Sequence, residues 1–255
     1  MDSVQRRGRD SGLPTDPVPH SADDFQRFFE AQVQAVRSST AVYTTAAAAD
    51  SASGAFSRPA SSPSLTAWRE VTEDEVHCIV LAAPAKSCCL DPIPTFLLRN
   101  CIESVLPFLT VLVNTSLREG HSPASQKKAV VTPLLKKPSL NTQNIQNYRP
   151  VSNLTFVSKL VERVAVKQLV EYLEANELMP RLQSAYRRHY STETALLKVL
   201  SDALTAADNQ KVTLLALLDL SAAFDCVDHD ILLSRLQSVF ALRGSCSGLD
   251  LVFLD

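Results

Sequence analysis

The stretch VTLLALLDLSAAF, from Val212 to Phe224, decides the fold that the sequence predicts. Its apolar run from Val212 to Leu218 has the length of a β-strand and no regular alternation of apolar and polar residues. Such a pattern is typical of a central strand buried on both faces. The run ends at Asp219, so the predicted strand would carry a carboxylate to one edge of a sheet.

More acidic residues follow this strand, namely Asp225, Asp228 and Asp230. A single carboxylate at a strand end is usually a helix N-cap or a turn former. Several carboxylates near one sheet edge instead favour a metal-dependent phosphoryl-transfer site, because hard divalent cations prefer oxygen ligands.

Several helices and one further strand are predicted upstream of this stretch. Thr72 and Glu75 form a T-x-x-E capping box at the start of a short helix that Pro84 closes. Gly120 is suited to the C′ position that ends a helix. The other predicted elements are two helices within Thr95 to Arg118, a strand over Ala129 to Leu135, the longest helix over Ser158 to Leu178, and a helix from Thr192 to about Ala207 capped by Ser191 or Thr192.

Residues 1–64 are rich in Ala, Ser, Pro and Thr, a composition that predicts a disordered leader because it cannot offset the entropy of ordering. One island, near residues 22–37, predicts an amphipathic helix that Ser21 and Asp24 would start. Its apolar face consists of Phe25, Phe28, Phe29, Val33 and Val36. We interpret it as a docking helix; a solvated fragment or a part of the core are the alternatives.

Composition excludes several classes of protein. The chain has 255 residues, 45% of them hydrophobic, and a formal net charge of −2. It has no run of ~20 uncharged apolar residues, as a membrane span requires, and its start, MDSVQRRGRD, lacks the apolar segment of a secretory signal. The six cysteines show no metal-binding spacing and are predicted to be buried, reduced thiols. We therefore expect an intracellular protein, cytoplasmic or nuclear, and not a secreted one.

The near-neutral total hides a basic block. Between His121 and Tyr190 there are 11 Lys and Arg residues and 4 Glu residues, a balance of +7. A basic block beside an acidic site fits a partner with a phosphate backbone. A solvated helix face would explain the same composition equally well.

Four segments in fixed order separate these two interpretations. They are KSCCLDPIPTFLLRNC (86–101), TPLLKKPSLNTQNIQNYRPVSNL (132–154), QSAYRRHYSTETALLKVLSD (183–202) and LLALLDLSAAFDCVDH (214–229). Together they closely resemble the reverse transcriptase domain of LINE-type, non-LTR retrotransposons, over roughly Asp23 to Phe240. The resemblance implies an α+β fold: a partial right-hand polymerase, with helical fingers and the first palm strand. It also implies three segments: the leader over 1–64, a partial reverse transcriptase domain over 65–240, and a divergent tail over 241–255.

The segment DLSAAFD resembles the first palm motif of that family. The resemblance implies that Asp219 is the catalytic aspartate and a ligand of Mg²⁺, with the backbone carbonyl of Leu220 as a second ligand. It implies that Phe224 is the steric gate that selects deoxynucleotides, with ordinary core packing as the alternative. Asp225 is implied to be structural.

The segments NYRPVSNL and QSAYRR resemble two fingers motifs. Arginine suits this role, because its planar fork engages phosphate oxygens in pairs; pairing with a nearby helix carboxylate is the alternative. The implied contacts to template or incoming nucleotide are Arg149, Gln183, Tyr186 and Arg187, and the implied contacts to nucleic-acid backbone are Lys136, Lys137 and Arg188. Asp91, Pro92 and Pro94 are interpreted as turn and helix-start residues.

The chain also departs from the family. No aromatic-x-Asp-Asp motif, the second palm motif, follows Asp219, and the adjacent aspartates Asp23 and Asp24 lie far upstream. One aspartate supplies too little negative charge to hold two divalent ions about 3.5–4 Å apart. We therefore expect a fragment of an RNA-directed DNA polymerase that is inactive alone, whose parent enzyme acts on an RNA template, a DNA primer and deoxynucleoside triphosphates.

Two alternatives belong to other classes. The chain could be a non-catalytic module that binds nucleic acid or protein through its basic fingers. A phosphatase with Asp219 as nucleophile is disfavoured, because Ser221 stands where its D-x-D motif would need an aspartate.

Overall fold

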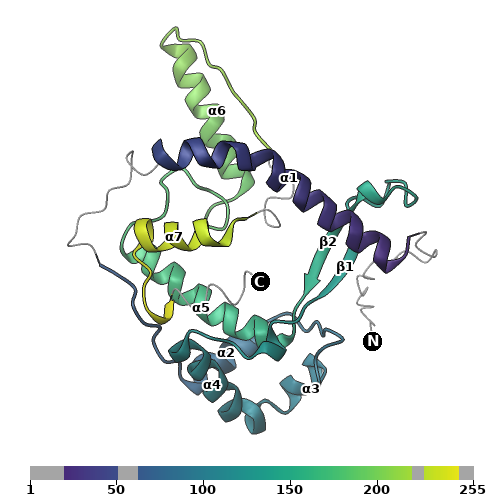
Figure 1. Cartoon of the computed structure of the whole chain (residues 1–255). Helices are drawn as coiled ribbons and strands as arrows, with labels where there is room; N and C mark the ends of the chain where they lie inside the picture. Colours follow the sequence, from purple (N-terminus) through teal and green to yellow (C-terminus); the bar gives the residue numbers. More distant parts are fainter. Residues whose placement is uncertain (1–19, 51–62, 220–226, 247–255) are drawn as a thin grey trace, which may run out of the picture. The chain divides into compact units, whose positions relative to one another are not determined.

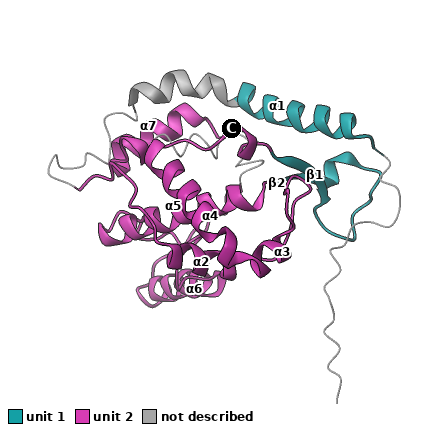
Figure 2. Ribbon diagram, turned by 90° about the horizontal axis from the view of Figure 1, so that it is seen from below, with its two compact units in different colours: residues 1–51, 129–153 teal, residues 52–128, 154–255 magenta. Residues whose placement is uncertain are grey.

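A computed structural model describes residues 20–50, 63–219 and 227–246 (Figure 1). They form two compact units, shown in different colours in Figure 2. Unit 1 combines residues 1–51 with 129–153, and unit 2 combines residues 52–128 with 154–255. The class predicted from sequence, mixed helix and strand, is confirmed, because helices dominate and a two-stranded sheet accompanies them.

Unit 2 is built around three helices that pack on one another: α2 (Glu73–Ala82), α4 (Ile102–Glu119) and α5 (Phe156–Ala175). Their apolar faces form one hydrophobic core. Its fully buried side chains include Val76 and Val80 of α2, Val113 of α4, and Leu160 of α5. This helical core is the scaffold from which the loops of unit 2 extend.

The predicted local signals of α2 and α4 are confirmed. The hydroxyl of Thr72 accepts from the backbone N–H of Glu75, and the Glu75 carboxylate accepts from the backbone N–H of Thr72 at 3.1 Å. At the other end of α2, the Arg99 guanidinium donates to the carbonyl oxygens of Val80, Leu81 and Ala83. A cation there satisfies carbonyls that have no partner within the helix.

Gly120 ends α4 in the left-handed conformation, with φ 62°. The short helix α3 (Thr95–Asn100) precedes α4, so the two helices expected within Thr95 to Arg118 are present. The short 3-10 turn η1 (Ala124–Gln126) follows.

Two amide side chains hold an extended segment, Trp68 to Val71, against the helices. The Gln168 amide of α5 accepts from the backbone N–H of Arg69 at 2.8 Å and donates to its carbonyl at 2.9 Å. The Asn114 amide of α4 does the same with Val71, at 2.8 and 2.9 Å. These amides supply the backbone bonds that a neighbouring strand would otherwise provide.

The loop before α3 caps α5. Asp91 accepts from the backbone N–H of Cys88 at 2.6 Å and from that of Phe156 at 2.7 Å. Phe156 is the first residue of α5, and Thr155 is its N-cap, with a hydroxyl that accepts from Ser158. The prediction that Asp91 is a turn and helix-start residue is therefore confirmed. The helix that it caps begins 65 positions further along the chain.

The segment after Phe240 packs into the core of unit 2. Leu242 and Cys246 are fully buried. The segment bonds to Leu65 as a parallel bridge, in which Arg243 N–H donates to the Leu65 carbonyl at 2.9 Å. The start of the predicted divergent tail is thus a structural part of this unit.

Gly244 permits this docking. It has a φ of +61°, and a Cβ built on it would lie 2.4 Å from the carbonyl oxygen of Thr66. Any side chain at Gly244 would collide with the backbone that the segment contacts, so a glycine is required.

The predicted central strand over Val212 to Leu218 is wrong. These residues have no regular secondary structure, and the side chains of Val212 and Leu218 are 98% and 94% exposed. A strand needs a neighbour to pair its backbone groups, and the two-stranded sheet of the described residues lies elsewhere, in unit 1.

Helices α6 (Thr192–Asp208) and α7 (His229–Phe240) also belong to unit 2, and neither contains a buried residue. The predicted helix from Thr192 is confirmed, and Ser191 is its N-cap. The predicted helix over Ser158 to Leu178 is α5, but α5 is not the longest helix described, because α1 has 29 residues and α5 has 20.

Unit 1 contains helix α1 (Ala22–Asp50) and a hairpin of β1 (Val130–Leu135) and β2 (Tyr148–Asn153). The short 3-10 turn η2 (Ile145–Asn147) leads into β2. The strands are antiparallel, with Val130 opposite Asn153 and Leu135 opposite Tyr148. The predicted strand over Ala129 to Leu135 is confirmed, whereas its partner β2 had been identified only as a fingers motif.

The predicted docking helix is confirmed in its start and its apolar face. Ser21 and Asp24 cap each other reciprocally, and Phe25 is buried against Tyr148 of β2, with ring centroids 4.9 Å apart. The backbone of α1 continues to Asp50, through part of the leader predicted to be disordered. The rest of that leader, residues 1–19 and 51–62, lies outside the described residues.

The cysteine prediction needs correction. Cys78, Cys89 and Cys101 are free and exposed, whereas Cys246 is buried. Cys226 lies outside the described residues. Most of the described thiols are therefore not core residues, contrary to the prediction.

Candidate nucleic-acid interface

Three predicted contact residues lie in unit 1, on or beside the hairpin. Arg149 stands in β2 opposite Leu134 and is exposed. Its neighbour Tyr148 is buried against α1, and successive strand residues point to opposite faces. Arg149 therefore projects from the face of the hairpin that α1 leaves open.

The two lysines follow β1. The Lys136 ammonium donates to the backbone carbonyl of Gln146 at 2.8 Å, which holds this side chain across the base of the connecting loop. Lys137 is exposed. Lys136 is thus fixed in position, and an ammonium with one bond made keeps N–H donors for a second partner.

The loop between α5 and α6 carries four predicted contact residues, all in unit 2. The Arg187 guanidinium donates to the Pro180 carbonyl at 3.2 Å and lies 4.6 Å from the centre of the Tyr190 ring. The Gln183 amide donates to the carbonyl of Ala185 at 3.1 Å. These contacts hold Arg187 and Gln183 inside the loop.

Tyr186 and Arg188 in the same loop are exposed. The Tyr186 side chain is 85% exposed on a residue with a φ of 57°. Such a left-handed, outward-pointing aromatic is unusual, because it combines a backbone penalty with solvent contact of an apolar ring. In the described ranges, none of the ion pairs involves Arg149, Arg187 or Arg188, so the alternative of helix carboxylate partners finds no support there.

Asp219 is exposed at the end of the irregular segment that replaces the predicted strand. Leu220, Phe224 and Asp225 lie outside the described residues. Asp228 accepts from the backbone N–H of Ile231 at 3.0 Å and is the N-cap of α7, which is the ordinary structural role weighed against metal binding.

A two-metal site does not fit the residues that are described. Residues 20–50, 63–219 and 227–246 contain no group of three or more His, Cys, Asp or Glu side chains that could hold a metal ion. One exposed carboxylate, Asp219, is too little charge for two divalent cations. No catalytic step through magnesium is therefore derived for this chain.

Two further residues near these positions were not found by sequence reasoning. Tyr190 supports Arg187 by a cation–π contact, and Gln146 supports Lys136 through its carbonyl. The Arg-x-x-Tyr spacing in a short loop was a usable signal for the first pair. Nothing in the sequence indicated the second.

Similarity to known proteins agrees with this arrangement. Residues 135–244 match the family described as reverse transcriptase (RNA-dependent DNA polymerase). The matched stretch contains β2, α5, both arginine-bearing segments and Asp219.

Among curated proteins, the chain is 28% identical over 171 residues to the RNA-directed DNA polymerase from mobile element jockey of Drosophila melanogaster, covering 67% of this chain and 19% of that protein. It is 27% identical over 168 residues to the probable RNA-directed DNA polymerase from transposon BS of the same fly, covering 66% of this chain and 18% of that protein. It is 28% identical over 132 residues to the probable RNA-directed DNA polymerase from transposon X-element, also of that fly, covering 52% of this chain and 14% of that protein.

The matched part of the chain is similar to reverse transcriptases, as the motifs predicted. More particularly, the relatives that it resembles are RNA-directed DNA polymerases of mobile elements and transposons. The chain spans about a fifth of the length of the first curated relatives that it matches. None of the helices in the described ranges has the length and apolar character needed to cross a membrane.

Proposed function

We propose that this chain is the fingers portion, with the start of the palm, of a non-LTR reverse transcriptase, and that it contacts template and incoming nucleotide without polymerising alone. The observation that carries the proposal is the set of arginines on the two matched fingers segments, of which Arg149 and Arg188 are exposed and Arg187 is half-buried. Arg149 projects from the open face of the hairpin, and Arg187 is pre-positioned on Tyr190. Pre-positioned guanidinium groups suit phosphate, because their fork binds two oxygens at once.

The proposed roles follow the family motifs. Arg149 contacts template or triphosphate, and Gln183, Tyr186 and Arg187 lie against the template and the incoming nucleotide. The phosphate backbone is contacted by the ammonium groups of Lys136 and Lys137 and by the guanidinium group of Arg188. The exposed ring of Tyr186 gives an unpaired base a surface on which to stack.

The palm roles are proposed on the resemblance alone. Asp219 and the carbonyl of Leu220 would belong to the magnesium site of the parent enzyme, and Phe224 would be its steric gate. The domain boundaries 1–64, 65–240 and 241–255 belong to the same proposal, with the qualification that Leu242 and Cys246 are buried in unit 2.

Salt dependence of RNA binding tests the proposal directly. A fluorescent single-stranded RNA is titrated with the purified chain at several salt concentrations. Each lost phosphate contact reduces the slope of log affinity against log salt by about 0.7. We expect that reduction for Arg149→Met and for Arg188→Met. The matched control is Arg118→Met on α4, an exposed arginine whose carboxylate partner is Glu70, and its slope should equal that of the wild type.

Primer extension tests the catalytic half of the proposal. With an RNA template, a DNA primer and magnesium, the chain alone should give no extended product. Extension that disappears in Asp219→Ala would contradict the expected inactivity. Equal, salt-independent RNA binding by all variants would contradict the nucleic-acid role itself and favour a protein-binding module.

A further inference from the structure

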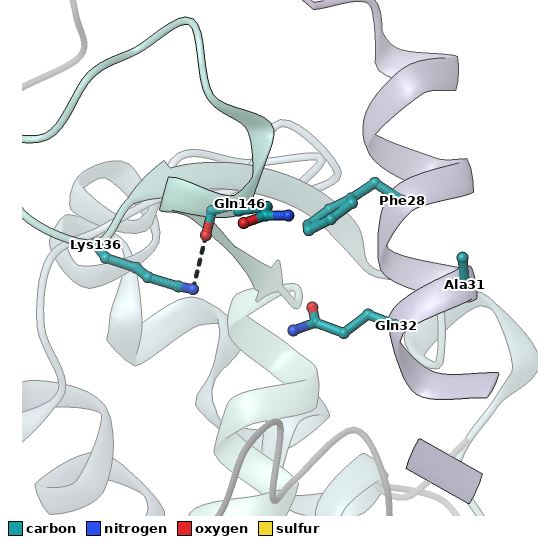
Figure 3. A pocket seen from close by; sticks show the side chains of 5 residues that line it. All are labelled: Phe28, Ala31, Gln32, Lys136 and Gln146. Carbon is teal, nitrogen blue, oxygen red and sulfur yellow. Dashed lines mark hydrogen bonds between the residues drawn. The ribbon is translucent and has the colours of Figure 1, made fainter. Parts of the chain in front are cut away.

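Unit 1 contains a pocket that no family motif accounts for. It lies between α1 and the loop that joins the two strands, and Figure 3 shows its five lining residues. The lining residues are Phe28, Ala31 and Gln32 of α1, with Lys136 and Gln146 of the hairpin loop. All five belong to one compact unit, so the pocket does not depend on how the two units are placed.

The walls of the pocket carry one aromatic ring, two amides and one cation. In Figure 3 the Lys136 ammonium and the Gln32 amide point toward one another from opposite sides, and the Gln146 amide lies beside the Phe28 ring. The Lys136 ammonium is anchored by the Gln146 carbonyl at 2.8 Å. The cation of the pocket is therefore held in a fixed place.

The aromatic wall is also held in place. The Phe28 ring lies 5.6 Å from the Phe29 ring, which stacks at 5.9 Å on Phe25. Phe25 in turn is buried against Tyr148 of the hairpin. This ring cluster ties α1 to the strands, whereas Phe28 at its end is only half-buried and keeps part of its surface open to the pocket.

These groups match the parts of a nucleotide. A ring offers a stacking surface to a nucleobase, and amides carry both donors and acceptors for a base edge. An ammonium group attracts a phosphate. The five lining residues include no carboxylate, which disfavours a metal ion.

We propose that this pocket binds one unpaired nucleotide of a single strand, with its base on Phe28 and its phosphate on Lys136. A base that is paired inside a duplex cannot expose its face in this way, so the pocket selects single-stranded over double-stranded nucleic acid. The proposal rests on the proposed function, since it assumes that the chain contacts nucleic acid. It adds a contact from α1, which lies upstream of the matched residues 135–244.

A comparison of normal and abasic strands tests the pocket. The full chain is titrated with a labelled single-stranded RNA of roughly 12 nucleotides, within the range that single-strand-binding surfaces cover. It is then titrated with a strand of the same length that lacks bases but keeps its phosphates. The same two titrations are made with Phe28→Ala, Phe28→Tyr, Gln32→Ala and Lys136→Met.

We expect Phe28→Ala to weaken binding of the normal strand about 10-fold, as removal of one stacking platform does. It should leave binding of the abasic strand nearly unchanged. Phe28→Tyr, which keeps the ring, should bind both strands like the wild type. Lys136→Met should reduce the salt slope by about 0.7 for both strands. The matched control for Gln32→Ala is Gln34→Ala, an exposed residue of the same helix that does not line the pocket, and it should bind like the wild type.

The outcomes separate this inference from the proposed function. If the wild type binds RNA, and the Phe28→Ala variant discriminates normal from abasic strands as well as the wild type does, the pocket is not a base site. The proposed function then still stands. If the wild type does not bind RNA at all, both fail. Displacement of the labelled strand by free uridine monophosphate at the same molar concentration as the strand would show a site for free nucleotides. That result would overturn the assignment of the pocket to a single strand.

Discussion

Asp91 accepts a hydrogen bond of 2.7 Å from the backbone N–H of Phe156, the first residue of a helix that begins 65 positions further along the chain. A negative charge at a helix N-terminus is favourable, because it meets unpaired N–H donors and the positive end of the helix dipole. One carboxylate thus joins the segment over 86–101, which resembles the reverse transcriptase family, to the helix that follows the segment over 132–154.

We expect Asp91→Ala to lower the free energy of unfolding by about 1–2 kcal/mol, the range for loss of a helix cap. Asp91→Asn, which keeps one acceptor oxygen, should lose less. Urea unfolding followed by circular dichroism measures both. If Asp91→Asn lowered the free energy of unfolding as much as Asp91→Ala does, the helix cap would not be the source of the stabilisation.

The Gln168 clamp on Arg69 gives a second stability prediction. Gln168→Leu leaves a backbone N–H and carbonyl without their partners, so we expect a loss of about 2 kcal/mol. Asn114→Leu should act similarly on the same segment. Because both clamps hold the same segment, we expect the double variant to lose less than the two single losses together. Glu174→Gln, exposed on the same helix as Gln168, is the control and should change stability by under about 0.5 kcal/mol.

Glu75 predicts how stability depends on pH. Hydrogen bonds from Arg69 and from the Thr72 backbone lower the pKa of Glu75 from 4.5 to about 2. The folded state therefore binds a proton at this carboxylate less readily than the unfolded state does. Its contribution to stability is complete above the unfolded pKa of 4.5 and is lost as the pH falls toward 2.

The corresponding experiment compares wild type and Glu75→Gln by urea unfolding at several pH values. The stability difference should be greatest above pH 4.5 and should shrink toward pH 2. Glu73→Gln, exposed in the same first turn, should leave the shape of the profile unchanged. A difference that stays constant across this range would show that Glu75 does not titrate as proposed.

Gly244 is expected to control the docking of the last described segment. Gly244→Ala places a Cβ 2.4 Å from the Thr66 carbonyl oxygen and keeps an unfavourable φ of +61°. We expect a loss of about 2 kcal/mol or more. The direct readout is alkylation of Cys246, which is fully buried and should react far more slowly in the wild type than the exposed Cys78 and Cys101. If Cys246 of the wild-type chain is alkylated as fast as Cys78 and Cys101, the docking of this segment is contradicted.

The exposed face of α6 predicts self-association. Leu197, Leu200 and Leu204 are 64%, 55% and 57% exposed. Leu197→Glu should reduce light scattering by the concentrated chain, with a change in stability of under about 0.5 kcal/mol, because no packing is lost. A large loss of stability would show instead that this face is packed in solution.

How far sequence reasoning succeeded depends on how far apart the interacting residues lie. The Thr72 and Glu75 capping box, the Ser191 cap and the end of α4 at Gly120 were all predicted correctly. Each involves residues within one helical turn, so the backbone geometry of the helix end fixes the choice of side chain.

The candidate interface was predictable as a set of residues but not as a surface. The motifs singled out Arg149, but its outward direction follows from pairing β2 with β1 in one register, because a shift by one residue would turn it toward α1. The pocket of Phe28 and Lys136 joins residues more than a hundred positions apart, and no pattern in the sequence links them.

The sequence by itself predicted the similarity of the matched segment to reverse transcriptases, the ends of α2 and α6, and the apolar face of α1. Only the tertiary structure decided that residues 212–218 are exposed rather than a central strand, that Asp91 caps α5, and that Cys246 is buried. The physical reason is the same in each case. An apolar run is compatible with several structures, and which one forms depends on whether a partner from a distant part of the chain pairs its backbone and covers its side chains.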